Sequence, residues 1–339
     1  MHKIQFSLFA FFLFAFALHP GAARAAETFC SDTAKALRDA CGAEVEDDFH
    51  VARAKCINVS DDDEREECFG EATLERHQGH RFCGQLLRGR RNACNLLGQE
   101  RYDPDFDPAD FDADYHNPVH PNAYYPLRVG NRWEFAGGTE TNIVEVLDET
   151  KLIEGLTCIV VRDRVYFGDD LHENTDDWYC QARNGDVYYL GEEVKDYESY
   201  DGDDPRVAEL VSIDGSFKHG RDGDKGGLIF SASPAVGDAY IEEFSLGNAE
   251  DVTEILSTTY SYGVRPELDN LVPPALANYL CSGNCVVTKN YSLLEPGIYA
   301  LKYYTPGIGI FLEVEPDVSL AIRLTDCNFD SRCDSLPQP

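Results

Sequence analysis

The sequence predicts an α+β protein, in which a disulfide-stapled antiparallel helical hairpin precedes a strongly curved antiparallel β-sheet (a half-barrel or a sandwich). Two observations favour this fold class. Six of the twelve cysteines are spaced symmetrically along a helix-forming segment, and the chain beyond residue 122 is rich in tyrosine, valine and isoleucine with regular glycine turns. The expected parts are a signal peptide (1–26), the helical hairpin (27–100), an acidic proline-rich linker (101–121), the antiparallel β domain (122–326) and a disulfide-closed C-terminal tail (327–339).

The first 26 residues have the features of a secretory signal peptide. A short basic start with Lys3 precedes an apolar run of about 15 residues and a small-residue cleavage site after Ala25 or Ala26. This run is too short for a comfortable membrane-spanning helix and no second one follows, so we expect no membrane span. We expect the mature protein to be exported, either to the periplasm or to the extracellular medium.

The chain is strongly acidic, with 29 Lys and Arg against 61 Asp and Glu and a formal net charge of −32. Cleavage after residue 26 removes Lys3 and Arg24 and no acid, so the mature net charge is 27 minus 61, or −34. A field of this sign repels nucleic acid and attracts cations. We therefore expect no nucleic acid partner and consider divalent cations as ligands, against the alternative of a solvated acidic surface.

An even number of cysteines in an exported chain predicts disulfides. The first six cysteines are separated by 11, 15, 12, 15 and 11 residues, a series that reads the same in both directions. Antiparallel helices over about 31–57 and 61–97, the second capped by Ser60, place each symmetric pair at one height, because 11 and 15 residues are close to whole helical turns. The predicted pairs are Cys30–Cys94, Cys41–Cys83 and Cys56–Cys68.

Beyond residue 122, about ten or eleven strand-like segments alternate with turn signals. A turn at 168–170 centres one hairpin on residue 169, which sets Cys158 opposite Cys180 and predicts a cross-strand disulfide. The two remaining predicted pairs are local in sequence: Cys281–Cys285 and Cys327–Cys333.

Four blocks of the chain are "RYDPDFDPADF", "NAYYPLRVGNRWEF", "DWYCQARNGDVYYLGEEVKDYE" and "SLLEPGIYALKYYTPGIGIFLE". Their order resembles a family of exported bacterial proteins of unknown function with DPxxDPADF, PLxxGxRWxF and LEPGxxxxKYYxPGIG blocks. The resemblance covers most of residues 101–313. It implies export and this fold, and it implies no activity.

The search for catalytic motifs is negative: we find no nucleophile elbow, zinc-protease, phosphate-loop or dinucleotide-binding motif. With every cysteine assigned to a disulfide, no thiol nucleophile remains. Carboxylates are abundant, and Asp176 with Asp177, beside Trp178, is one candidate pair for a hydrolase. The sequence thus favours a protein that is not an enzyme and leaves catalytic residues unassigned.

Two tyrosine pairs, Tyr188–Tyr189 and Tyr303–Tyr304, are candidates to line a concavity for a small apolar or sugar ligand. Neighbouring residues of a strand point to opposite faces, so one tyrosine of each pair is expected in the core.

One cation site is suggested near the C-terminus. Four oxygen-bearing residues have offsets 1, 3, 5 and 9, as in a calcium loop: Asp326, Asn328, Asp330 and Asp334. Ser331 replaces the usual glycine and no glutamate stands at offset 12, although the Cys327–Cys333 bridge could preform the loop. The alternative is a solvated C-terminal knot.

Three classes of function remain open. The favoured one is a non-catalytic binding or structural protein of the cell envelope or medium; the alternatives are a secreted carboxylate-dependent hydrolase and a divalent-cation-binding protein. An apolar concavity would favour the first, a polar cleft with two carboxylates about 5–10 Å apart the second, and converging C-terminal aspartates the third.

We expect the protein to fold without a cofactor, because six disulfides already hold it, and to gain stability from calcium. An ion at a hundredfold excess over its Kd adds about 2.7 kcal/mol to the free energy of unfolding. Thermal melting in calcium chloride and in sodium chloride of equal ionic strength should show a calcium-only rise that Asp326→Ala with Asp330→Ala removes. Equal shifts in the two salts would reduce these aspartates to a solvated acidic face.

Overall fold

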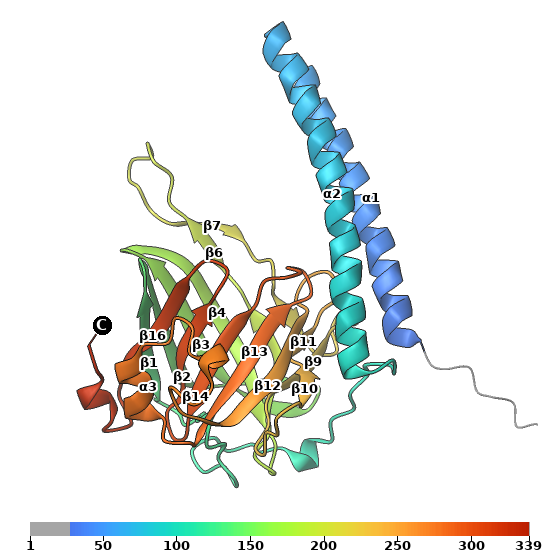
Figure 1. Cartoon of the computed structure of the whole chain (residues 1–339). Coiled ribbons are helices and arrows are strands. Elements are labelled where there is room, and N and C mark those ends of the chain that lie inside the picture. The colour runs from blue at the N-terminus through green and yellow to red at the C-terminus, as the bar shows by residue number, and fades with distance from the viewer. Residues whose placement is uncertain (1–27, 339) are drawn as a thin grey trace, which may run out of the picture.

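A computed structural model describes residues 28–338, and the expected signal peptide lies outside the described residues (Figure 1). The chain begins with two long antiparallel helices, α1 (Phe29–Ile57) and α2 (Asp62–Leu97). Three disulfides join them at three heights, with Cα–Cα distances of 5.7, 5.8 and 5.6 Å: Cys30–Cys94, Cys41–Cys83 and Cys56–Cys68. These are the three pairs that the cysteine spacing predicts, and the stapled hairpin is confirmed.

Small residues allow the two helices to approach closely enough for disulfides. Ala34 and Ala72 are buried between them, and a Cβ added at Gly79 would lie 2.7 Å from a methyl group of Val45. The N-cap of α2 is Asp61 rather than Ser60: its Oδ1 accepts hydrogen bonds from the backbone N–H groups of Asp63 and Glu64 at 2.9 and 3.0 Å. Aspartate and serine cap equally well, so the sequence alone could not choose between neighbours.

Sixteen strands follow, in one antiparallel, strongly curved sheet. The expected α+β class is confirmed, and of the two expected forms of the sheet the half-barrel is confirmed, because a sandwich would need two sheets. Their bounds are β1 Arg132–Gly137, β2 Glu140–Ile153, β3 Leu156–Phe167, β4 Asp170–Gln181, β5 Val187–Glu193, β6 Asp196–Glu198, β7 Glu209–Ser212, β8 Phe217–Lys218, β9 Lys225–Phe230, β10 Ala239–Ile241, β11 Glu243–Phe244, β12 Asp251–Tyr260, β13 Cys285–Ser292, β14 Ala300–Thr305, β15 Gly309–Glu315 and β16 Leu320–Cys327. The number exceeds the expected ten or eleven because β6, β7, β8 and β9 carry little β-forming pattern, and because the single strand-like segment 239–244 divides into β10 and β11.

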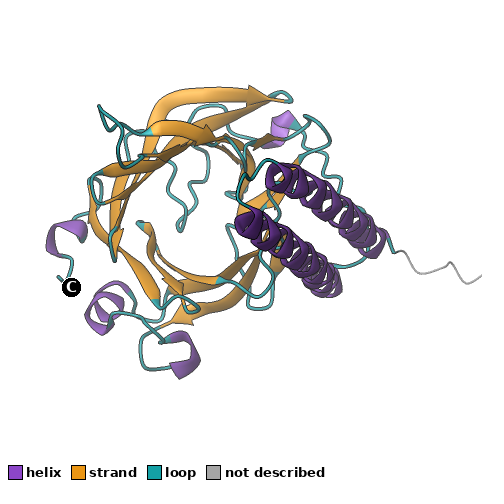
Figure 2. Cartoon of the chain, turned by 90° about the horizontal axis from the view of Figure 1, so that it is seen from above, coloured by secondary structure: helices purple, strands orange, loops and turns teal. Residues whose placement is uncertain are grey.

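The sheet curls until its two ends meet, and we call it the barrel (Figure 2). Its strand order runs β10-β12-β13-β14-β15-β16-β1-β2-β3-β4-β5-β9-β11. The segment 239–244 pairs with β12 through β10 and then with β9 through β11. Gly227 makes this approach possible, since a Cβ there would lie 2.0 Å from the carbonyl oxygen of Ile241. The barrel is therefore nearly closed.

Three further disulfides lie in the barrel and its loops: Cys158–Cys180, Cys281–Cys285 and Cys327–Cys333. They are the pairs expected from the sequence. Residue 158 faces residue 180 because the β3–β4 register, for example Ile159 opposite Tyr179, follows the predicted turn. Six disulfides indicate an oxidising, extracytoplasmic environment. Within residues 28–338 we find no helix with the length and apolarity needed to cross a membrane.

Residues 101–121 contain one short 3-10 turn (Pro108–Asp110) and lie as an extended strap on the barrel. The strap is also part of the core: Phe111 and Tyr115 are buried. The Tyr115 hydroxyl donates to the carbonyl oxygen of Thr157 (2.9 Å) and accepts from the backbone N–H of Gln181 (3.0 Å). The strap thus ties itself to β3 and β4.

Replacing Tyr115 by phenylalanine should reduce the free energy of unfolding by about 1–3 kcal/mol, because the buried N–H of Gln181 loses its acceptor. Chemical denaturation of the oxidised protein measures this change. Tyr200→Phe is the matched control, since Tyr200 is 44% exposed and should leave stability unchanged. Equal effects of the two variants would mean that the hydrogen bonds of the Tyr115 hydroxyl add nothing to the stability of the barrel.

Candidate functional site

The strongest candidate site is a cavity of about 420 Å³ inside the barrel. Strand periodicity explains how its wall is built. On β4, the alternate residues Glu173, Thr175, Asp177 and Tyr179 all line the cavity, while the residues between them face outward. The same alternation brings Glu313 and Glu315 of β15 to the cavity wall.

Acidic side chains dominate this wall. Ten carboxyl groups line the cavity: Glu140, Asp163, Glu173, Asp177, Glu192, Glu242, Glu243, Asp251, Glu313 and Glu315. Among the lining residues of the described chain, Lys302 is the one basic side chain. The barrel therefore encloses a large excess of negative charge or a set of protonated carboxyl groups.

Burial decides between these two states. Loss of solvation raises the pKa of Glu192 to about 8 and that of Glu242 to about 7. The same cause, reinforced by neighbouring carboxylates, holds the pKa of Asp163 and Asp177 well above the usual range. The negative charge of Glu313 raises the pKa of Lys302, which stays protonated. Near neutral pH several of the carboxyl groups hold protons that a bound cation would displace.

Asp163 is the least satisfied of these acids. Its Oδ2 accepts one long hydrogen bond, of 3.4 Å, from the amide of Asn142. Its Oδ1 and the Oδ1 of Asn142 are both buried, and neither has a hydrogen-bond partner. Two buried oxygens without a partner favour a donor-bearing ligand that binds the ionised form of Asp163, since buried acceptors are normally paired.

Aromatic rings form the apolar part of the wall. Tyr179 stacks on Tyr189 at 4.8 Å between ring centroids, and Tyr125 meets Tyr179 edge-on at 5.3 Å. The Tyr189 hydroxyl donates a short hydrogen bond to Asp177. Rings and carboxyl groups thus alternate around one cavity.

The two tyrosine pairs separate as strand periodicity requires. Tyr189 and Tyr304 line the cavity. Tyr303 is buried on the other face, where its hydroxyl donates to the carbonyl oxygen of Leu268 at 2.6 Å. Tyr188 points outward, to a groove beside the helical hairpin.

The structure does not bring together Asp176 and Asp177, the candidate carboxylate pair suggested by the sequence. Asp176 lies on the outer face, where the Arg162 guanidinium donates to it at 2.8 Å, and Asp177 faces the cavity. The partner of Asp177 is Glu192, directly opposite on β5. Adjacent positions of a strand face opposite sides, whereas opposed positions of two strands have Cβ atoms about 4.5–5.5 Å apart.

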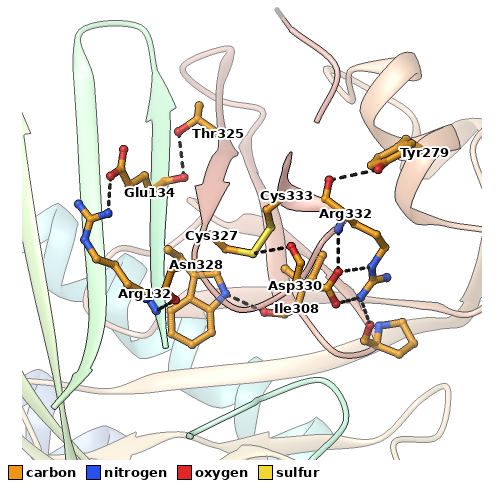
Figure 3. Close-up of a disulfide and its surroundings, with 12 residues drawn as sticks. Arg132, Glu134, Tyr279, Ile308, Thr325, Cys327, Asn328, Asp330, Arg332 and Cys333 are labelled. Atoms are coloured by element: carbon orange, nitrogen blue, oxygen red, sulfur yellow. Dashed lines mark hydrogen bonds and ion pairs between the residues drawn. A yellow bond between two sulfur atoms is a disulfide. The ribbon is translucent and has the colours of Figure 1, made fainter. Parts of the chain in front are cut away.

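Figure 3 shows the C-terminal loop with two of the four proposed calcium ligands, Asn328 and Asp330. Asp330 is bound by Arg332, with N–O distances of 2.8 and 2.9 Å, and Asn328 accepts from the backbone N–H of Arg132 at 2.9 Å. Asp326 and Asp334 are exposed. Nowhere in residues 28–338 are three or more His, Cys, Asp or Glu side chains arranged to hold a metal ion. A calcium ion here would displace the Arg332 pair, and the site stays a prediction.

Comparison with known proteins finds no relative: no protein-family model matches the chain, and neither does any curated protein or solved structure. The resemblance of the four sequence blocks to an exported family stays a prediction. We therefore infer function from the chemistry of the cavity.

Sequence reasoning missed most of the cavity acids. A signal was present in two strands, where acids recur on one face, four residues apart at 173 and 177 on β4 and two residues apart at 313 and 315 on β15. Such a pattern normally indicates a solvent-facing strand. Only the closed barrel turns that face inward.

The raised carboxyl pKa values predict how stability depends on pH. An acid with a pKa of about 4.5 unfolded and about 7–8 folded stabilises the fold fully below pH 4.5, and this contribution is lost as pH rises through 7–8. The melting temperature of the ligand-free protein should therefore fall between pH 5 and pH 9.

Glu192→Gln should make this fall shallower, because the amide cannot ionise. Asp47→Asn, an exposed position on α1, is the control and should leave the slope unchanged. Scanning calorimetry at several pH values measures both. A profile that is flat in the parent protein would show that the cavity acids are solvated and ionised throughout.

Proposed function

We propose that this protein is an exported binding protein, of the periplasm or the extracellular medium, whose barrel cavity binds a small organic cation. The observation that carries the proposal is the wall of ten carboxyl groups with one lysine around a cavity of about 420 Å³. This volume falls within the range of small-molecule sites in proteins.

Charge gives the first argument for a cation. Burying an unpaired carboxylate is unfavourable, and the raised pKa values of Asp163, Asp177 and Glu192 are the signature of that penalty. A cation inside the barrel compensates the charge and lets these groups ionise. Binding should therefore release protons and strengthen as pH rises.

The apolar part of the wall argues for an organic cation over a bare metal ion. Tyr179, Tyr189 and Tyr304 present rings to the cavity, alongside Val161 and Ile229. Aromatic faces attract organic ammonium groups, by about 0.5–2 kcal/mol for each well-placed ring. An amine with an aromatic or aliphatic body matches both halves of this wall.

A carboxylate-dependent hydrolase is the second candidate, and one observation favours it. Asp177 and Glu192 face each other across two strands, both with raised pKa values and with Tyr189 beside them. Retaining glycosidases use a protonated acid and a carboxylate about 5–5.5 Å apart, and opposed positions of two strands can bring two carboxyl groups to such a separation. The uncompensated charge of the whole wall, far beyond one pair, favours binding.

Titration calorimetry with two matched probes tests the proposal. Tyramine carries an ammonium group and 4-ethylphenol is the same molecule without it. Tyramine should bind at least tenfold more tightly, and its affinity should rise from pH 5 to pH 8. Asp163→Asn and Asp177→Asn should each weaken tyramine binding about tenfold, which corresponds to 1.4 kcal/mol. Asp47→Asn, on the exposed face of α1, should have no effect.

Three results would contradict the proposal. Equal affinity for the two probes would indicate an apolar site. If equimolar sodium chloride abolishes tyramine binding and the cavity variants leave it unchanged, tyramine binds to the acidic surface and not in the cavity. If the protein hydrolyses aryl glycosides, and Asp177→Asn and Glu192→Gln abolish this turnover, its function is hydrolysis and not binding.

A further inference from the structure

A second concavity lies outside the barrel, where the base of the helical hairpin meets β9, β10 and β11. This hairpin groove has a volume of about 920 Å³, twice that of the cavity. Figure 1 shows the hairpin standing against this side of the barrel and extending beyond it. The mechanism proposed for the cavity makes no use of the groove.

The walls of the groove are mainly apolar and only half-buried. Leu37 and Leu97 come from the two helices, and Leu228, Ile241 and Phe244 from the barrel. Tyr102 of the strap closes one side, with its ring 5.1 Å from that of Phe244. These apolar side chains face each other across an open gap and stay in contact with water. A ligand of matching shape would bury this apolar surface, which is favourable.

One polar group inside the groove lacks a partner. Arg90 of α2 is 5% exposed and forms a two-pronged ion pair with Glu250, at 2.8 and 2.7 Å. Its third nitrogen, Nη1, is buried and has no acceptor among the described residues. An unmatched buried donor on a charged group is unfavourable, and an oxygen atom from a ligand would satisfy it.

The charges around the groove indicate which kind of ligand oxygen could bind to Arg90. The positive charge of Arg90 is already neutralised by Glu250, and the second arginine of the lining, Arg101, lies over the ring of Phe29, 3.7 Å from its centre. Three acids of the lining, Asp32, Glu100 and Asp103, outweigh this second positive charge. Glu243 of β11 also lines the groove. The whole protein is strongly acidic. A carboxylate or phosphate head would meet repulsion here, whereas an ester, amide or hydroxyl oxygen would not.

We propose that the hairpin groove binds a single-chain lipid with an uncharged, oxygen-bearing head, of the monoacylglycerol type. The acyl chain lies between the helices and the outer face of β9–β11, and an oxygen of the head accepts from Arg90 Nη1. The groove shares Glu243 with the cavity wall, but the contacts proposed for the lipid do not involve this residue, so the proposal stands whether or not the cavity binds amines.

Displacement of an apolar fluorescent dye tests the groove in the full oxidised protein, with all lipids below their micellar concentrations. N-phenyl-1-naphthylamine fills apolar sites and has no oxygen-bearing head. It should fluoresce with the parent protein, and monolauroylglycerol should displace it at least tenfold more effectively than laurate, which has an anionic head. Leu97→Asp should abolish dye binding, and Leu74→Asp, the same change on the same helix at a residue 54% exposed, should not.

The head contact needs a variant that leaves no charge unpaired. Arg90→Leu with Glu250→Leu removes both partners of the buried pair, a replacement that is often neutral for stability. It should keep dye binding and weaken monolauroylglycerol about tenfold. If Leu97→Asp does not fold, Leu37→Asp repeats the wall test from α1.

Several outcomes would overturn the proposal. Dye binding that persists in folded Leu97→Asp or Leu37→Asp would place the apolar site elsewhere. The proposed contact between the head and Arg90 would be wrong if laurate competed as well as monolauroylglycerol. It would also be wrong if the double variant bound monolauroylglycerol with unchanged affinity. A dimer that Leu97→Asp dissociates, without dye binding in the parent protein, would make the groove an interface between two copies.

Discussion

Closure of the sheet at residues 239–244 is the constraint on which the rest of the structure depends. This short segment hydrogen-bonds to β12 with its first half and to β9 with its second half, so it holds both ends of the sheet at once. Gly227 makes room for it, because a Cβ there would overlap the backbone oxygen of Ile241, and Gly226 allows β5 the same close approach on the other side of β9, at the backbone oxygen of Tyr189. With the ends joined, each strand acquires an inner and an outer face, and every alternate side chain is committed to the cavity.

The inner face is chemically unlike a protein core. Hydrophobic burial stabilises most folds, whereas this barrel encloses ten carboxyl groups over part of its length. Stability comes from elsewhere, including buried apolar side chains such as Phe311, Leu312 and Val314, and three disulfides in the barrel and its loops. The acids reduce stability at neutral pH, and under the proposed function a bound cation compensates for this cost.

The hairpin obeys a different constraint. Two helices with few buried apolar side chains cannot form a stable pair by packing alone, and three disulfides at three heights replace the missing core. Contact with the barrel is fixed by the buried ion pair of Arg90 and Glu250, which joins residues 160 positions apart. Such a pair adds little net stability but tolerates no mismatch of position, so it sets where the hairpin stands and leaves the groove beside it.

The sequence by itself determined the features that depend on local periodicity. The helix ends fall within two residues of the expected 31–57 and 61–97, and all six disulfides pair as the cysteine spacing requires. Which residues line the cavity was decided by the tertiary structure alone. The cavity acids come from seven strands, between Glu140 and Glu315, and no local pattern brings such distant positions together. Asp177 was recognisable as a candidate acid, but its partner, Glu192, is set by the register of β4 against β5. Whether a polar strand face meets water or a cavity depends on closure of the sheet. Backbone hydrogen bonds between the two edges of the sheet close it, and such bonds leave no recognisable pattern in the sequence of either strand.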